Sequence, residues 1–121
     1  DAYSTIKVMM QEYKLDRIYL VPNGVESQRE GERLFTSINT VVQNFLGGKI
    51  KYLHSISADK MLTKAMKAAK PLVNYAPKSL AANDFSVLAK QVMDLESNIP
   101  LNGNIQFFVE RVAAQLASKA P

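Results

Sequence analysis

The stretch that decides the fold is residues 50–79, IKYLHSISADKMLTKAMKAAKPLVNYAPKS. Ile50, Tyr52 and Ile56 belong to a short apolar run whose branched and aromatic residues predict a β-strand. Asp59 follows as the expected N-cap of a helix over 60–70, which Pro71 ends because the residue before proline is pushed out of the α region. Open α/β sheets bind ligands where a strand turns into a helix, so this turn is the first candidate site.

A second strand is predicted upstream, at residues 18–21 (Ile-Tyr-Leu-Val). We expect Pro22-Asn23-Gly24 to end it, because proline offers no ladder donor and glycine permits positive φ. A helix predicted over 27–46 follows and stops at Gly47-Gly48. Its apolar stripe consists of Leu34, Phe35, Ile38, Val41, Val42 and Phe45. Two buried strands joined by a crossover helix predict a right-handed βαβ unit with parallel strands.

Further helices are expected on both sides of this unit. Residues 1–13 are predicted as a helix with Tyr3, Ile6, Met9, Met10 and Tyr13 on one face. Residues 80–95 are predicted as a helix introduced by Pro77 and Ser79, with Phe85, Leu88, Ala89, Val92 and Met93 inward. A linker at 100–104 and a last helix at 105–118 follow. The expected fold class is α/β, with two parallel strands and three C-terminal helices, in two parts: 1–98 and 99–121.

The composition excludes several functions. The 121 residues form one domain or part of one, and the absence of cysteine rules out disulfides, thiolate metal sites and cysteine nucleophiles. No apolar run approaches the roughly 18 residues that a membrane-spanning helix needs. The net charge of +4 is concentrated in lysines 49, 51, 60, 64, 67, 70 and 78, opposed there only by Asp59. These lysines form either a solvated surface or a surface for phosphate, nucleic acid or anionic lipid.

No catalytic residue is predicted. Gly47-Gly48-Lys49 lacks the remaining glycine and the Ser/Thr of a phosphate-binding loop. His54, Ser55, Ser57 and Asp59 lie close in sequence, but no nucleophile elbow accompanies them, which argues against a hydrolytic triad. The chain opens with Asp1 in a helical pattern, and two strands would leave both sheet edges open. We therefore expect a piece of a longer domain.

Two polar residues are candidates for ligand binding. In a parallel sheet, the turns at Asn23 and at Ser57-Ala58-Asp59 are expected to open on the same edge. Asn23 offers the donor and acceptor that a base would need, and Asp59 offers a carboxylate. Two plainer interpretations stay open: Asn23 as a turn residue, and Asp59 as a helix cap.

Four motifs in order resemble one family. Residues 18–25 (IYLVPNGV) are similar to the "LVVNMV"-type strand of MinD/ParA-like P-loop ATPases, and 52–59 with 64–71 and 77–79 are similar to their "YLG-IPxD…AV…PV…PxS" block. Residues 1–7 resemble their "TDAYxxIK" helix. Residues 103–111 (GNIQFFVER) are similar to the tail of the flagellar branch, the FlhG (FleN) proteins. The resemblance covers nearly the whole chain as a C-terminal half, with a partial P-loop NTPase (Rossmann-like) fold.

The resemblance implies a bacterial ATPase that dimerises around ATP, uses Mg, and controls flagellar number or placement from the cytoplasm and the inner membrane face. It places Asn23 and Ser57-Ala58-Asp59 at the adenine. Its implied partners are an FlhF-type GTPase, a flagellar transcription activator and switch proteins. The phosphate-loop lysine and the magnesium aspartate of the family have no counterpart here, so for this chain alone we expect no hydrolysis, no resident cofactor, and at most weak binding of ATP. Ser57 and His54 replace the usual proline and small residue of the loop.

The last predicted helix suggests a membrane or partner contact. Ile105, Phe108, Val109, Val112, Ala113 and Leu116 form one apolar face, and Phe107 points roughly opposite. The alternative is that this helix covers the edge of the core.

Two other functions remain open. A stripe of Lys60, Lys64 and Lys67 would bind nucleic acid in a ParA-like partitioning module, although we favour protein partners. The second is a protein–protein adaptor whose open sheet edges pair with each other in a dimer.

Overall fold

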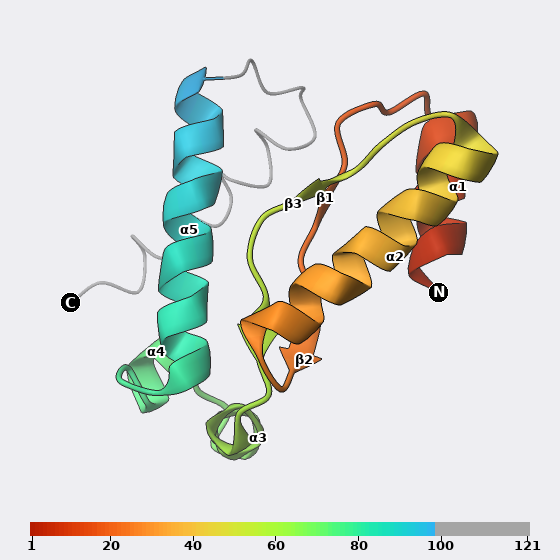
Figure 1. Ribbon diagram of the computed structural model, residues 1–121. Helices are drawn as coiled ribbons and strands as arrows, with labels where there is room; N and C mark the ends of the chain where they lie inside the picture. The colour runs from red at the N-terminus through yellow and green to blue at the C-terminus, as the bar shows by residue number, and fades with distance from the viewer. Residues whose placement is uncertain (99–121) are drawn as a thin grey trace. The chain divides into compact units, whose positions relative to one another are not determined.

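The structure is a computed structural model that describes residues 1–98 (Figure 1). The chain divides into two compact units, Asp1–Ala89 and Lys90–Pro121, and the described part of the second unit is the end of one helix. The predicted linker and last helix, at 99–121, lie outside the described residues.

The described elements confirm the predicted α/β class. They are α1 (Ala2–Gln11), β1 (Tyr19–Leu20), β2 (Asn23–Val25), α2 (Gln28–Leu46), β3 (Lys51–Tyr52), β4 (Ile56–Ser57), α3 (Lys60–Lys67), α4 (Leu72–Tyr75) and α5 (Leu80–Asn98). The short α4 occupies a stretch for which the sequence predicted no element.

The two strand runs are parallel, as predicted. β1 pairs with β3 and places Tyr19 opposite Lys51, while β2 pairs with β4 and places Asn23 opposite Ile56. The expectation that Pro22-Asn23-Gly24 ends the first run is wrong, because β2 begins directly after Pro22. Proline lacks only the donor, and the carbonyl oxygen of Pro22 accepts the N–H of Ile56 at 2.8 Å. The ladder therefore continues through the proline.

One extra residue in the second run changes which face its side chains occupy. Leu20 lies opposite Tyr52 and Asn23 opposite Ile56, so two residues of the first run face three of the second. An inserted residue reverses the alternation of side chains between the two faces of a strand. Ile50 accordingly packs in one core cluster and Ile56 in the other.

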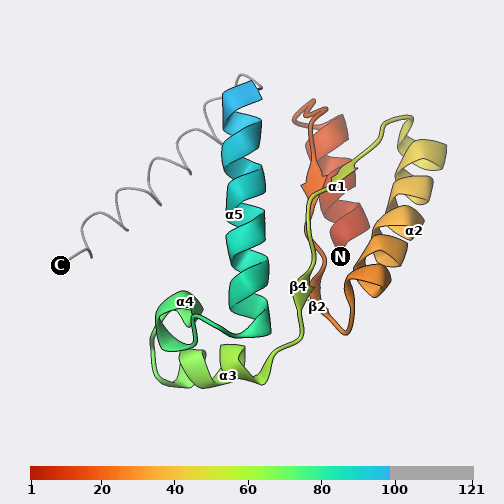
Figure 2. The ribbon, with the colours of Figure 1, turned by 60° about the vertical axis from the view of Figure 1, so that its left-hand side comes forward.

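The first cluster joins α1 and α2 to the strands, and these two helices lie side by side in Figures 1 and 2. Its buried members are Ile6, Ile18, Val42 and Ile50. The predicted stripe of α2 is only half right. Phe35, Ile38 and Val42 face this cluster, whereas Leu34, Val41 and Phe45 are exposed because they lie on the solvent side of the same stripe. Tyr13 follows the end of α1 and is also exposed.

The second cluster packs α3, α4 and the start of α5 against the strands. Its buried members are Ile56, Ala65, Leu72, Ala81 and Ala82. The inward face predicted for α5 is wrong in part: Phe85, Ala89 and Met93 are exposed, while Leu88 packs on the cluster. The alanines and Asp84 face inward instead, because small side chains let the helix lie close to β4.

The helix ends follow local rules. Ser27 accepts the N–H of Glu30 at 3.1 Å as N-cap of α2, and Gly47 ends that helix with φ 68°. α3 ends at Lys67, three residues before the predicted end. Its last turn closes through the N–H of Lys70, which donates to the Ala65 carbonyl, and Ala69 takes φ 53°.

Candidate functional site

The structure brings the predicted site residues onto neighbouring strands. Asn23 is exposed and lies opposite Ile56, one residue before Ser57. The N–H of Ala58 donates to the carbonyl of Val25 at 2.8 Å, so the two runs stay together at this end. Asn23 begins β2 and does not follow a strand end as predicted. The carboxyl ends of the two runs are Val25 and Ser57.

Asp59 holds two helix starts at once. Its Oδ1 accepts the N–H of Met61 in α3 and its Oδ2 accepts the N–H of Ala81 in α5, each at 2.9 Å. These backbone bonds, the one from Ala81 foremost, lower the pKa of the Asp59 carboxyl. The helix-cap interpretation of Asp59 is therefore confirmed, and both of its oxygens are engaged.

The backbone of Ser57 is hydrogen-bonded to the carboxylate of Asp84, a residue that the sequence analysis did not single out. Its N–H donates to Oδ2 of Asp84 at 2.9 Å, and Ser57 and Asp84 are 5% and 4% exposed. Burial alone would raise the pKa of Asp84, but hydrogen bonds from the hydroxyl and N–H of Ser57 and from His54 lower it overall. Asp84 is thus a buried, ionised acceptor.

His54 pairs with Asp84 and not with a serine. Its Nε2 lies 2.9 Å from Oδ1 of Asp84. The hydroxyl of Ser55 is instead 2.7 Å from the hydroxyl of Tyr52. Asp59 is occupied by the helix N-termini. The arrangement therefore holds no Ser-His-Asp triad, in agreement with the missing elbow motif.

Gln28, in the first turn of α2, connects these groups. Its Oε1 accepts the N–H of Ser55 and the hydroxyl of Tyr52, each at 3.2 Å. Its Nε2 donates to the carbonyl of Ser55 at 2.9 Å and to Asp84 at 3.3 Å. We call the connected set the polar network; it comprises Gln28, Tyr52, His54, Ser55, Ser57 and Asp84.

The polar network as a whole could not be predicted from the sequence. Gln28 and Asp84 are 56 residues apart and belong to two different helices. One signal was available, since Asp84 falls on the face of α5 that carries Ala81 and Leu88, where a charge needs a partner. The network fixes the segment from His54 to Asp59 between α2 and α5.

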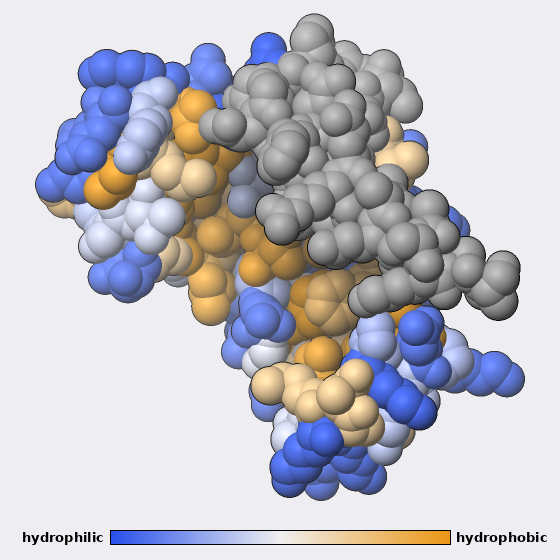
Figure 3. Space-filling model, turned by 180° about the vertical axis from the view of Figure 1, so that it is seen from behind, coloured by the Kyte–Doolittle hydropathy of each residue, from blue (hydrophilic) through white to orange (hydrophobic). Residues whose placement is uncertain are grey.

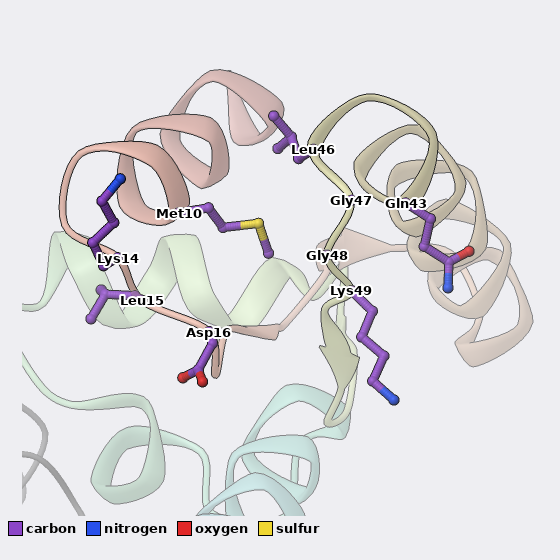
Figure 4. Close-up of a pocket in the computed structure, with 9 residues that line it drawn as sticks. All are labelled: Met10, Lys14, Leu15, Asp16, Gln43, Leu46, Gly47, Gly48 and Lys49. Carbon is purple, nitrogen blue, oxygen red and sulfur yellow. The ribbon is translucent and has the colours of Figure 1, made fainter.

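A cavity of about 790 Å³ lies elsewhere, before the amino ends of β1 and β3 (Figure 4). It is lined by Met10, Lys14, Leu15, Asp16, Gln43, Leu46, Gly47, Gly48 and Lys49. Met10 points into its centre, while the charged ends of Lys14, Asp16 and Lys49 point in different directions (Figure 4). Since these charges do not converge, this cavity is not the site that the sequence predicts.

Two features are absent from residues 1–98 and bear on other functions. No three His, Asp or Glu side chains gather there in a way that would hold a metal ion. None of the helices in that part of the chain has both the length and the apolar character needed to cross a bilayer.

The parallel runs, the crossover helix and the turn after β4 define part of a Rossmann-like α/β fold. No protein-family model matches the chain. Among curated proteins, the chain is similar to "Antiactivator FleN" of Pseudomonas aeruginosa, with 28% identity over 118 residues. The match covers 98% of this chain and 42% of FleN, so the chain spans less than half the length of that relative. It confirms the predicted resemblance to the flagellar branch of the MinD/ParA-like ATPases.

Proposed function

We propose that this chain supplies the base side of the nucleotide site of a MinD-like ATPase that regulates flagellar number or placement. The observation that carries the proposal is the match to FleN along 98% of the chain. The parallel runs support it, because they set Asn23 beside the segment that leads into residues 57–59. ATP and Mg would serve the intact protein.

The four proposed base-site residues have different exposures and so different roles. Asn23 and Ala58 are exposed, and we assign them the contacts to adenine. The Asn23 amide can both donate to and accept from a base edge. Ser57 is buried and Asp59 caps two helices, so these two hold the turn in place.

The partners implied by the resemblance remain part of this proposal. They are an FlhF-type GTPase, a flagellar transcription activator or switch proteins, and a second copy in a dimer. We further propose a peripheral contact to the inner membrane face. Its residues, Ile105, Phe107, Phe108, Val109, Val112 and Leu116, lie outside the described residues. The division of the chain into residues 1–98 and a C-terminal tail at 99–121 is also part of this proposal.

Ligand selectivity tests the base-side role. Adenosine and ATP should bind this chain with equal and weak affinity in calorimetry, and tripolyphosphate should not bind, because the proposed contacts reach only the base. Asn23→Ala should weaken adenosine binding about tenfold, the effect of one lost base-edge contact of about 1.4 kcal/mol. Asn44→Ala, at an exposed position of α2, is the matched control. Binding of tripolyphosphate without adenosine would contradict the proposal.

A second candidate function rests on the basic face of α3. Lys60, Lys64 and Lys67 are all exposed, and they lie opposite Ala65, which is buried in the core. Such a stripe would bind the phosphates of nucleic acid with a strong dependence on salt. A fluorescence titration with duplex DNA at 20 mM and 200 mM salt decides this; binding that is unchanged by Lys64→Ala removes the candidate.

A further inference from the structure

The first turn of α5 anchors the residues on both sides of Ala58. On one side, the N–H of Ser57 donates to Oδ2 of Asp84 at 2.9 Å. On the other side, Oδ2 of Asp59 accepts the N–H of Ala81 at 2.9 Å. Ala58 lies between these two anchored residues and is itself exposed. One end of α5 therefore holds the exposed residue of the proposed base site from both sides.

The hydrogen bond from Ser57 lies outside the pairing of the two strand runs. Ile56 and Ala58 donate their N–H groups to the first run, residues 18–25, at 2.8 Å each. Because alternate residues of a parallel strand direct their N–H groups to opposite sides, the Ser57 N–H points away from the first run. It needs an acceptor there, and Asp84 is that acceptor. A proline at position 57 would have no N–H and would need none.

Ser57 and Asp84 depend on each other because their surroundings are largely apolar. Both residues are buried, and the same stretch of α5 places Ala81 and Ala82 in the core. Hydrophobic residues also gather at the centre of the face seen in Figure 3. A buried N–H or carboxylate that loses its partner in such surroundings costs free energy.

The carboxylate of Asp84 is also held at its other oxygen. Oδ1 lies 2.9 Å from Nε2 of His54 and accepts a hydrogen bond from Nε2 of Gln28 at 3.3 Å. Contacts at both oxygens fix the orientation of the carboxylate, so Oδ2 stays directed at Ser57. Ser57 and His54 are the two positions at which this loop departs from the motif that it resembles. Both departures contact the same carboxylate.

We infer that Asp84 is the positioning residue of the base-side turn: its carboxylate fixes the backbone at Ser57, as the ring of a proline would. Asp84 is assigned no contact with the base and acts through Ser57. The inference rests on the proposed function, because the turn matters only if it binds a base. It requires residues 57 and 84 to be exchangeable as a pair, aspartate with a residue that has an N–H, or a small apolar residue with proline.

ATP titrations of the ¹⁵N-labelled 121-residue chain test this pairing. Asp84→Ala leaves the Ser57 N–H buried without its acceptor, so ATP affinity should fall about tenfold. Ser57→Pro alone should also weaken binding, because Oδ2 of Asp84 then loses its donor. The double variant removes the donor and the acceptor together, so its affinity should return to within about twofold of wild type. The same substitution is thus harmful in one background and restorative in the other.

Val42→Ala is the matched control for a general loss of stability. Val42 is fully buried in the other core cluster, so its truncation should lower stability and leave ATP affinity unchanged. The ¹³Cα shift of Ala58 gives a second readout that needs no ligand. It should move in Asp84→Ala and return in the double variant.

Equal ATP affinities of wild type and Asp84→Ala, or a double variant that binds no better than Asp84→Ala, would overturn the inference. If Asp84→Ala does not fold, recovery of a folded spectrum on adding Ser57→Pro supports the inference, and an unfolded double variant overturns it. A wild-type chain that binds no ATP contradicts the proposed function alone. The Ala58 shift then decides the inference, since a shift that fails to return in the double variant contradicts it.

Discussion

At the scale of single residues, Gly31 lies so close to Ser55 that the position has no room for a side chain. A Cβ atom added at Gly31 would collide with Ser55. It would lie only 2.7 Å from the Cβ of Ser55 and closer still to the Ser55 hydroxyl oxygen. Ser55 is fully buried and cannot withdraw. Gly31→Ala should therefore destabilise the protein by about 1–3 kcal/mol in urea unfolding.

Gly48→Ala is the matched control for that prediction. Its added Cβ would meet only the flexible end of Met10, at 3.2 Å, so a much smaller loss of stability is expected. Equal urea midpoints for the two variants would show that α2 does not approach Ser55 as closely as described.

Asp84 is the charged centre of the polar network. Asp84→Asn weakens the acceptor for Ser57 and His54, and we expect a loss of about 1–3 kcal/mol in unfolding free energy at pH 7. The sign of the pH dependence follows from the lowered pKa of Asp84. Its contribution is fully present above the unfolded pKa of about 3.9 and is lost as the pH falls through the lower, folded value.

Urea unfolding of both proteins between pH 7 and pH 2.5 measures this dependence. Wild type should lose stability below about pH 4, and Asp84→Asn should lose less over the same range. Parallel curves for the two proteins would mean that the Asp84 carboxylate adds nothing specific to folding.

At the scale of elements, the backbone just after α3 is strained at Ala69, and a substitution can relieve that strain. Ala69 takes φ 53°, a conformation that costs a residue with a Cβ about 1 kcal/mol and glycine almost nothing. Ala69→Gly should therefore raise the free energy of unfolding by about 1 kcal/mol. Ala68→Gly should lower it, because Ala68 is right-handed, at φ −82°. Thermal unfolding distinguishes the two, and a destabilised Ala69→Gly would contradict the assigned helix end.

Asp59 and Ser27 allow two helix caps to be compared. Ser27→Ala removes one bond from the start of α2 and should cost about 1 kcal/mol. Asp59→Ala removes the cap of α3 together with the bond to Ala81, so its thermal midpoint should fall further. A smaller shift for Asp59→Ala than for Ser27→Ala would mean that the tie to α5 contributes nothing.

The elements also show where the sequence was sufficient. The cap at Asp59 and the breaker at Gly47 act within a few residues, and these predictions were confirmed. The inward faces of α2 and α5 depend on partners far along the chain, so three of the six positions predicted for α2 and three of the five predicted for α5 were assigned wrongly. The extra residue between Tyr52 and Ile56 moves side chains between faces, and no local pattern marks it.

At the scale of the whole molecule, the parallel runs give the chain its candidate function. The sequence predicted the direction of both strands and the neighbourhood of Asn23 and residues 57–59. It did not predict that Gln28 and Asp84 would bind the backbone of Ser55 and Ser57, because those contacts join distant helices to the second run.

Amide chemical-shift mapping of the ¹⁵N-labelled chain during an ATP titration tests the central claim most directly. We predict the largest shifts at Asn23, Ser57 and Ala58, because the proposed adenine contacts lie across the two parallel runs. Residues of the cavity before the strands, such as Gly47 and Gly48, should not shift. Shifts confined to that cavity, or a spectrum unchanged at saturating ATP, would contradict the base-side assignment.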